Sequence, residues 1–237
     1  MPRKRSIALS LLRLAAAAIT IALPLAAATA GTTVTIQGEK FLINGVSTFA
    51  GGTLDGTLPN SRMVQATFDD ANAATVGNWK YPDGSAYSPT RQTNEFVAAL
   101  PSYRANGLLT VTLNFQGGTP ISGAQTQPWD NTAFNSDGSL KPAYLARMDQ
   151  AIRALDAQGM VAIVGYFYFG QIRVFNGNET AVKAACTNAT AWILSQGYTN
   201  VLVEIANECD GPDGTGSAYP AIIRPARVGE LISAVQT

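Results

Sequence analysis

Apolar and polar positions along most of the chain repeat one unit, in which an amphipathic segment ends near a glycine and a short apolar run follows. In the first unit, apolar residues recur at helical spacing over residues 93–105, Asn106 and Gly107 supply a helix-ending signal, and the apolar run 108–113 follows. Two later units predict helices over 142–159 and 182–197, followed by apolar runs at 160–164 and 201–205. Continuous apolar runs are typical of parallel strands that are covered on both faces.

The two ends of this series complete the predicted fold. Residues 34–36 and 40–43 predict a hairpin around Gly38, residues 47–50 predict the first strand of the series, and residues 227–235 predict a final helix. The order is therefore a hairpin and then four strands, each followed by a helix. This alternation predicts an α/β fold with a parallel sheet, either a (β/α)8 barrel or an open doubly wound sheet. No GxGxxG motif follows any predicted strand, so a dinucleotide-binding Rossmann domain has little support.

Composition excludes several kinds of chemistry. The 237 residues include no histidine and two cysteines, so Ser-His-Asp triads, His-ligated zinc, proximal-His haem and four-cysteine zinc or iron–sulfur sites cannot be built. We expect no cofactor and no metal. The 16 basic residues balance 16 acidic ones, which leaves no strongly basic surface and argues against nucleic acid as a partner. Any proton transfer must come from carboxylates, Tyr, Lys or Cys.

The first thirty residues are typical of a signal peptide. Arg3, Lys4 and Arg5 precede an uncharged stretch from Leu14, and the stretch ends in the small-residue pattern of residues 28–30. We therefore expect residues 1–30 to be a signal peptide and residues 31–237 to be one secreted or extracytoplasmic domain that has no membrane association after cleavage. A permanent membrane anchor is the weaker alternative, because Pro24 and many alanines interrupt the stretch.

Export changes how the two cysteines are interpreted. In an oxidising compartment Cys186 and Cys209 could form a disulfide, which the chain-entropy model values at roughly 3 kcal/mol. Two separate thiols are the equal alternative.

Polar and aromatic residues follow the predicted strands, where the chemistry of parallel α/β folds is found. Aromatic faces can cover the apolar C–H patches of a sugar while amides and carboxylates bind its hydroxyl groups, although ordinary loop packing explains any single aromatic residue. On this basis we predict a carbohydrate-binding surface with the following residues: Asp70, Asn114, Gln116, Trp129 and Tyr168.

Residues 200–211 contain the most specific motif of the chain. Glu204 lies among apolar residues of a predicted strand, and Asn207-Glu208 stands at its tip. This pattern resembles the fourth strand of clan A glycoside hydrolases, nearest to the cellulase-like family 5, and residues 41–45 resemble the Phe-x-x-Asn-Gly entry to the first strand in many members. The resemblance implies a (β/α)8 barrel, a general acid/base role for Glu208 and binding of the substrate 2-hydroxyl by Asn207.

The chemistry of glycoside hydrolysis is compatible with these residue types, since it needs two carboxyl groups and neither metal nor histidine. A retaining enzyme places the two groups about 5 Å apart, one as acid and the other as nucleophile. We expect burial and a neighbouring carboxylate to raise the pKa of Glu208 and keep it protonated. The alternative is a structural carboxylate bonded to loop amides.

The chain also departs from the family pattern. The family nucleophile is a second Glu on the seventh strand, and no residue of this chain matches it. The histidine often found near the family acid/base is absent, and Arg62 is the clearest counterpart of the family arginine. Cys209 follows Glu208 at the position where the family commonly has proline. We therefore predict the N-terminal half of a barrel, truncated after the fourth unit, that by itself aggregates, dimerises or remains partly molten. A monodisperse monomer that melts cooperatively contradicts this.

Three functions follow from these observations. The leading one is a secreted glycosidase-like domain that acts on a poly- or oligosaccharide by a two-carboxylate, retaining mechanism. The alternative is a non-catalytic exported carbohydrate-binding or cell-surface protein on the same fold, which the missing nucleophile and histidine favour. A calcium-stabilised domain using Asp210 and Asp213 is the weakest, because this segment lacks EF-hand spacing.

Overall fold

The computed structural model describes residues 31–117, 127–209 and 220–236. The predicted signal peptide and the calcium segment with Asp210 and Asp213 lie outside these residues. In the described part of the chain, no helix is both long enough and apolar enough to cross a membrane.

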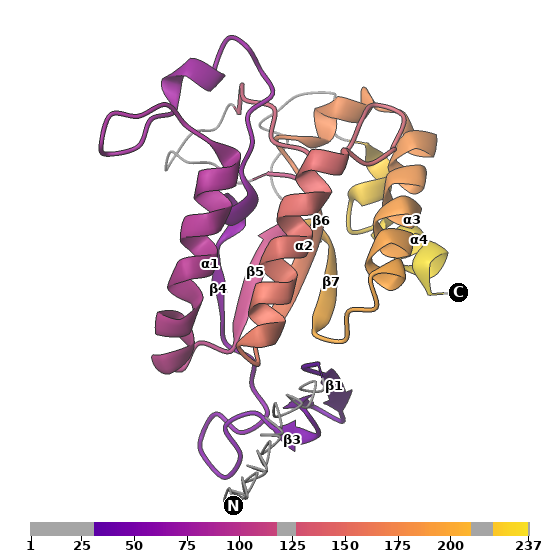
Figure 1. Cartoon of the computed structure of the whole chain (residues 1–237). Coiled ribbons are helices and arrows are strands. Elements are labelled where there is room, and N and C mark those ends of the chain that lie inside the picture. Colours follow the sequence, from indigo (N-terminus) through magenta and orange to yellow (C-terminus); the bar gives the residue numbers. More distant parts are fainter. Residues whose placement is uncertain (1–30, 118–126, 210–219, 237) are drawn as a thin grey trace, which may run out of the picture. The chain divides into compact units, whose positions relative to one another are not determined.

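A four-stranded parallel sheet forms the centre of the fold, and its strands follow one another in sequence order. The strands are β4 (Asn60–Arg62), β5 (Thr110–Asn114), β6 (Val161–Tyr168) and β7 (Val201–Asn207), and the helices are α1 (Pro89–Ala105), α2 (Pro142–Ala157), α3 (Glu179–Ser195) and α4 (Val228–Val235). Short 3-10 helices occupy the connections: η1 (Val64–Thr67), η2 (Val76–Asn78), η3 (Ile172–Phe175) and η5 (Ala221–Ile223). The mixed α/β class and the parallel sheet are therefore confirmed, with one helix after each strand (Figure 1).

The predicted first strand at residues 47–50 is wrong. Val46–Ser47 forms β3, which pairs antiparallel with β2 (Lys40–Ile43), and β2 pairs with β1 (Val34–Gln37) in a separate three-stranded sheet. The parallel series begins instead at β4, whose sequence Asn-Ser-Arg has no apolar residue. This edge strand is defined by its pairing with β5 rather than by a hydrophobic pattern of its own.

The core lies between the sheet and the helices that cover it. Leu100 of α1, Met148 and Leu155 of α2 and Ala185 of α3 are at most 1% exposed and belong to one apolar cluster with the strand residues Val111 and Leu113. All of β5 is buried, as its continuous apolar character predicts, whereas β7 is mostly half-buried. Figure 1 shows α1 and α2 packed over the same side of β4, β5 and β6.

The start of the described chain is attached to the amino-terminal edge of the parallel sheet. Thr32 donates its amide to Asp156 Oδ1 at the end of α2, and Val34 donates its amide to the carbonyl of Thr199, just before β7. The hairpin sheet therefore begins at the edge opposite to the one where β5, β6 and β7 end. The carboxyl edge is left to the long loops.

Helix α3 offers a direct test of local stabilisation. Asn178 is its N-cap, and the side-chain oxygen accepts hydrogen bonds from the amides of Thr180 and Ala181. We expect Asn178→Ala to lower the free energy of unfolding by about 1 kcal/mol, because two amides at the helix start lose their acceptor. Chemical denaturation measures the loss. Asn178→Ser should retain most of the stability, and equal losses in both variants would contradict the capping role.

Candidate functional site

The carboxyl edge of the parallel sheet gathers one polar side chain from each strand end. Arg62 ends β4, Asn114 ends β5, Tyr168 ends β6 and Asn207 ends β7, with Glu208 directly after it. Tyr168 and Asn207 are partners in the strand register. The register places Arg62 level with Thr112, Asn114 level with Gly165 and Glu204, and Tyr168 level with Asn207 three residues further along. These five strand-end residues are called the edge cluster.

Glu208 has an unusual backbone conformation at this edge. Its φ is +50°, in the left-handed region that is unfavourable for residues other than Gly, Asn and Asp. Such strain is found preferentially at functional sites, where the surrounding structure maintains it. The sequence predicts a buried side chain, but the Glu208 side chain is exposed, because it projects from the tip of β7 rather than from the interior of the strand.

Tyr168 connects Glu208 to Arg62. Its side chain is 9% exposed, and the Arg62 guanidinium carbon lies 5.9 Å from the centre of its ring. Burial is the main cause that raises the pKa of Tyr168; the Glu208 carboxylate raises it further, while Arg62 and Gln127 oppose the change. Tyr168 therefore remains a neutral hydrogen-bonding group at ordinary pH, within the electrostatic influence of both Glu208 and Arg62.

Glu204 lies deeper along β7 and was not predicted as a site residue. Its Oε2 is 3.9 Å from Arg62 Nη1, a long ion pair between β7 and β4, and this oxygen has no hydrogen-bond partner among the described residues. The sequence signal for this contact was present: Glu204 is the one charged residue in a strand that is otherwise apolar up to Asn207. Only the curvature and register of the sheet could identify Arg62 as its partner.

Asn114 and Glu204 meet over Gly165, their neighbour in the register of the sheet. A Cβ placed on Gly165 would lie 2.5 Å from Asn114 Oδ1 and 3.1 Å from Glu204 Oε2. Glycine is therefore required for the close approach of these two polar groups. Asn114 is 1% exposed, and neither its Oδ1 nor its Nδ2 has a hydrogen-bond partner among the described residues. A buried amide without partners is uncommon in native proteins and marks a place where water or a ligand completes the bonding.

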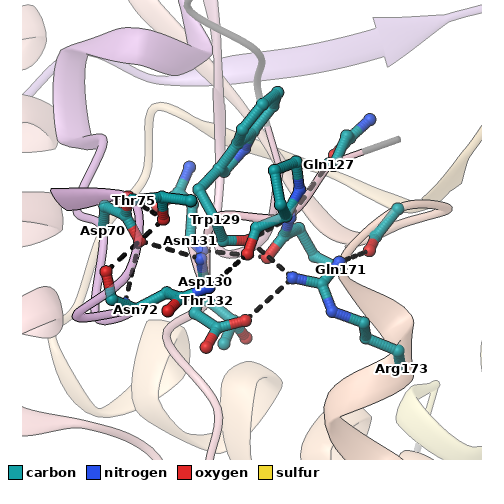
Figure 2. A network of polar contacts seen from close by, with 12 residues as sticks. Asp70, Asn72, Thr75, Gln127, Trp129, Asp130, Asn131, Thr132, Gln171 and Arg173 are labelled. Carbon is teal, nitrogen blue, oxygen red and sulfur yellow. Dashed lines mark hydrogen bonds and ion pairs between the residues drawn. The ribbon is translucent and has the colours of Figure 1, made fainter. Parts of the chain in front are cut away.

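The other predicted site residues lie in a separate layer of loops, shown in Figure 2. Asp70 is 5% exposed and accepts hydrogen bonds from Thr75 Oγ1 at 2.6 Å, Trp79 Nε1 at 2.6 Å and the amides of Asn72 and Asp130. Burial, the largest influence, acts to raise the pKa of Asp70, but these four hydrogen bonds outweigh it and hold the pKa below its usual value. The carboxylate is thus engaged in joining two loops.

Gln116 and Trp129 are also enclosed in this layer. Gln116 is fully buried, donates to Thr132 Oγ1 and the carbonyl of Gln171, and accepts from the amide of Tyr168. The Trp129 ring is 2% exposed and lies edge-to-face against Trp79, at 5.6 Å between ring centres. Neither side chain presents a face to solvent, and Gln116 contacts the edge cluster through the amide of Tyr168.

Gln171 and Arg173 hold the same layer together. Gln171 accepts from the amide of Asn131 and donates to the carbonyl of Trp129, and Arg173 binds that carbonyl as well as Asp130, at 2.8 Å (Figure 2). These contacts join residues about forty positions apart in sequence. The structure therefore divides the predicted set: Asn114, Tyr168, Asn207 and Glu208 at the edge, and Asp70, Gln116 and Trp129 in the loops.

Of the two equal alternatives for the cysteines, the structure has the separate thiols and not the disulfide. Cys186 is fully buried on α3, with its sulfur 3.9 Å from the carbonyl oxygen of Leu231 in α4, whereas Cys209 follows β7 and is half-buried. Both are free thiols, and burial raises the pKa of Cys186 to about 12, which makes it unreactive. The bridge fails because Cys186 faces the helix–helix core.

Across residues 31–117, 127–209 and 220–236, no group of three or more His, Cys, Asp or Glu side chains is close enough to hold an ion.

No protein-family model and no curated protein matches the chain. Among solved structures, it is similar to a GH5-4 broad specificity endoglucanase from an uncultured bacterium, with a TM-score of 0.41 and 10% sequence identity over 73% of this chain. The match covers 52% of that protein, so this chain spans about half its length. A likeness of this size assigns neither a family nor a function to this chain.

Proposed function

We propose that this protein is a secreted carbohydrate-active protein of the glycoside hydrolase type, built as the N-terminal half of a (β/α)8 barrel. Glu208 is its general acid/base and Asn207 positions the substrate. The observation that carries the proposal is the left-handed conformation of Glu208 at the carboxyl edge, next to Asn207 and close enough to Tyr168 to help raise the pKa of that hydroxyl. Strained backbone conformations cluster at active sites and ligand clamps, and the carboxyl ends of the strands are where the chemistry of such folds is found.

The chemistry that this arrangement supports is protonation of a leaving glycosidic oxygen. Glu208 donates its proton to that oxygen as the bond to the anomeric carbon breaks, and a second carboxylate attacks the carbon from the opposite face. The Tyr168 hydroxyl, which remains protonated, and the Asn207 amide offer hydrogen bonds to sugar hydroxyl groups at the same edge. The second carboxylate is not identified among the described residues. Retention of configuration at the anomeric carbon, which requires that carboxylate as the nucleophile, is therefore proposed and not observed.

A non-catalytic carbohydrate-binding protein is the second candidate. It is favoured by Glu204, the carboxylate within β7, whose Oε2 forms a long ion pair with Arg62 Nη1 at 3.9 Å. With that carboxylate engaged, the edge cluster supplies one acid and several hydrogen-bonding groups, which is sufficient for binding but not for the two-carboxylate reaction.

Incubation of the full chain with a panel of aryl glycosides and polysaccharides tests the proposal, with released sugars measured by chromatography and binding measured by calorimetry. Hydrolysis of at least one substrate is the expected result, and inversion or retention at the anomeric carbon is read by proton NMR. Binding without any cleavage would replace the hydrolase with the carbohydrate-binding protein. Neither binding nor cleavage would overturn both.

A further inference from the structure

A pocket of about 310 Å³ lies beside the loop layer, outside the edge cluster. Its polar lining comes from three elements: Asp130 and Thr132 of the loop after β5, Lys141 at the start of α2, and Gln171 and Arg173 at η3. The volume is at the lower end of the range for small-molecule sites, about 300–1,000 Å³. Four of these five residues are labelled in Figure 2.

The charges around this pocket leave one cation in excess. Asp130 is paired with Arg173 at 2.8 Å, and Asp69 is paired with Arg147 at 2.7 Å. Lys141 has no carboxylate within 4.0 Å and no hydrogen-bond acceptor for its ammonium group among the described residues. Three hydrogen-bond donors and one positive charge therefore remain available at the pocket wall.

Thr132 adds a further donor. Its Oγ1 accepts from Gln116 Nε2 and from the amide of Phe134, both at 3.1 Å, which uses both lone pairs. The residue is 5% exposed, and the hydroxyl hydrogen has no acceptor within the described part of the chain. Gln171, by contrast, uses both ends of its amide in the loop layer. Lys141 and Thr132 therefore leave donors open in the pocket, beside the Asp130 carboxylate, whose Oδ1 accepts from Arg173. These open donors suit a ligand that offers acceptors.

Partial burial strengthens this preference. Burial is the main cause that lowers the pKa of Lys141, and the carboxylates of Asp130 and Asp69 only partly oppose it. A half-buried ammonium that has lost water gains from an anion at contact distance. Helix α2 begins directly after Lys141, so the positive end of its dipole lies at the same wall.

We propose that this pocket binds a carboxylate group, with Lys141 and the Thr132 hydroxyl as its donors. The carrier that suits the neighbouring edge cluster is the uronic acid unit of an acidic carbohydrate, and this choice of carrier rests on the proposed function. Gln116 joins the two places, since it donates to Thr132 and accepts from the amide of Tyr168. A small organic acid has the same chemistry and is the other possible source of the group.

Carbon-13 NMR of the reductively dimethylated protein tests the site directly, because each lysine gives its own methyl signal and keeps its charge. The signal missing from Lys141→Gln identifies Lys141. We expect this signal to move saturably with sodium galacturonate and with sodium acetate, but not with galactose or with sodium chloride at equal ionic strength. Tighter binding of galacturonate than of acetate identifies the sugar acid as the source, and equal binding identifies a small organic acid.

Calorimetry with galacturonate supplies the matched comparison. Lys141→Gln should weaken binding at least tenfold, Lys141→Arg should restore most of it, and Lys80→Gln, at an exposed lysine elsewhere, should leave it unchanged. No shift of the Lys141 signal with any carboxylate, or an equal shift with chloride, would overturn the proposal. Binding of galacturonate by a chain that hydrolyses nothing would reject the hydrolase and leave the carboxylate site standing.

Discussion

The Glu208→Gln variant should lose at least about a hundredfold in hydrolytic rate while its thermal unfolding midpoint stays the same. Glutamine has the shape of the glutamic acid but cannot deliver its proton, and removal of a general acid typically costs 10²–10⁴ in rate. Glu208 is exposed, so the substitution should change stability by no more than about 0.5 kcal/mol. The comparison of kcat/KM on the best aryl glycoside measures the loss.

The control is the same substitution at Glu95. This residue is exposed on α1, where it pairs with Arg91 at 2.6 Å, and Glu95→Gln should keep the full rate. Equal rates for the wild type and Glu208→Gln would remove the acid/base assignment. With a substrate that has a very good leaving group, the difference in hydrolytic rate between the wild type and Glu208→Gln should be smaller, because such a leaving group needs little protonation as it departs.

Asp70→Ala should lower the free energy of unfolding by about 3 kcal/mol, which is the largest stability effect that the loop layer predicts. The substitution leaves Thr75 Oγ1, Trp79 Nε1 and the amide of Asp130 without their common acceptor. Each buried donor left unpaired costs about 1–3 kcal/mol, and the costs within one network are not additive. Urea denaturation gives the loss, and the indole N–H signal of Trp79 in proton NMR reports the broken contact.

The stability that Asp70 contributes should depend on pH in a defined direction. Its pKa is lowered in the folded protein from the usual 3.8, so the contribution is complete above pH 3.8 and disappears as the pH falls through the lower folded value. Asp70→Asn keeps the shape but cannot titrate, so its deficit relative to wild type should shrink on acidification from neutral pH to pH 3. A deficit that stays constant would show that the charge of Asp70 is unimportant.

The regular elements could be predicted from local pattern, with shifts at their ends. The first helix begins at Pro89 rather than near Thr93, because Ser88 caps it and proline fits its first turn. Strand β4 could not be predicted, because Asn60, Ser61 and Arg62 carry no apolar signal and are ordered by pairing with β5. A strand defined by its partner leaves no local trace in the sequence.

The candidate site divides in the same way. The Asn207-Glu208 pair could be located from sequence because it directly follows an apolar strand, and parallel strands end at a common edge. The environments of Asp70, Trp129 and Cys186 could not be predicted from sequence, because each depends on a contact with a distant segment. The contacts are Asp130 with Asp70, Trp79 with Trp129 and Leu231 with Cys186.

The sequence by itself determined the α/β class, the order of the elements from α1 onward and the strand end where Glu208 lies, because hydrophobic periodicity and helix-ending glycines act over a few residues. Only the tertiary structure decided which polar residues face the edge, which are enclosed in the loop layer, and that Arg62 meets Glu204. Those contacts depend on strand register and on loop packing between remote segments. The carboxylate pocket belongs to this second group, since it takes its lining from three separate parts of the chain.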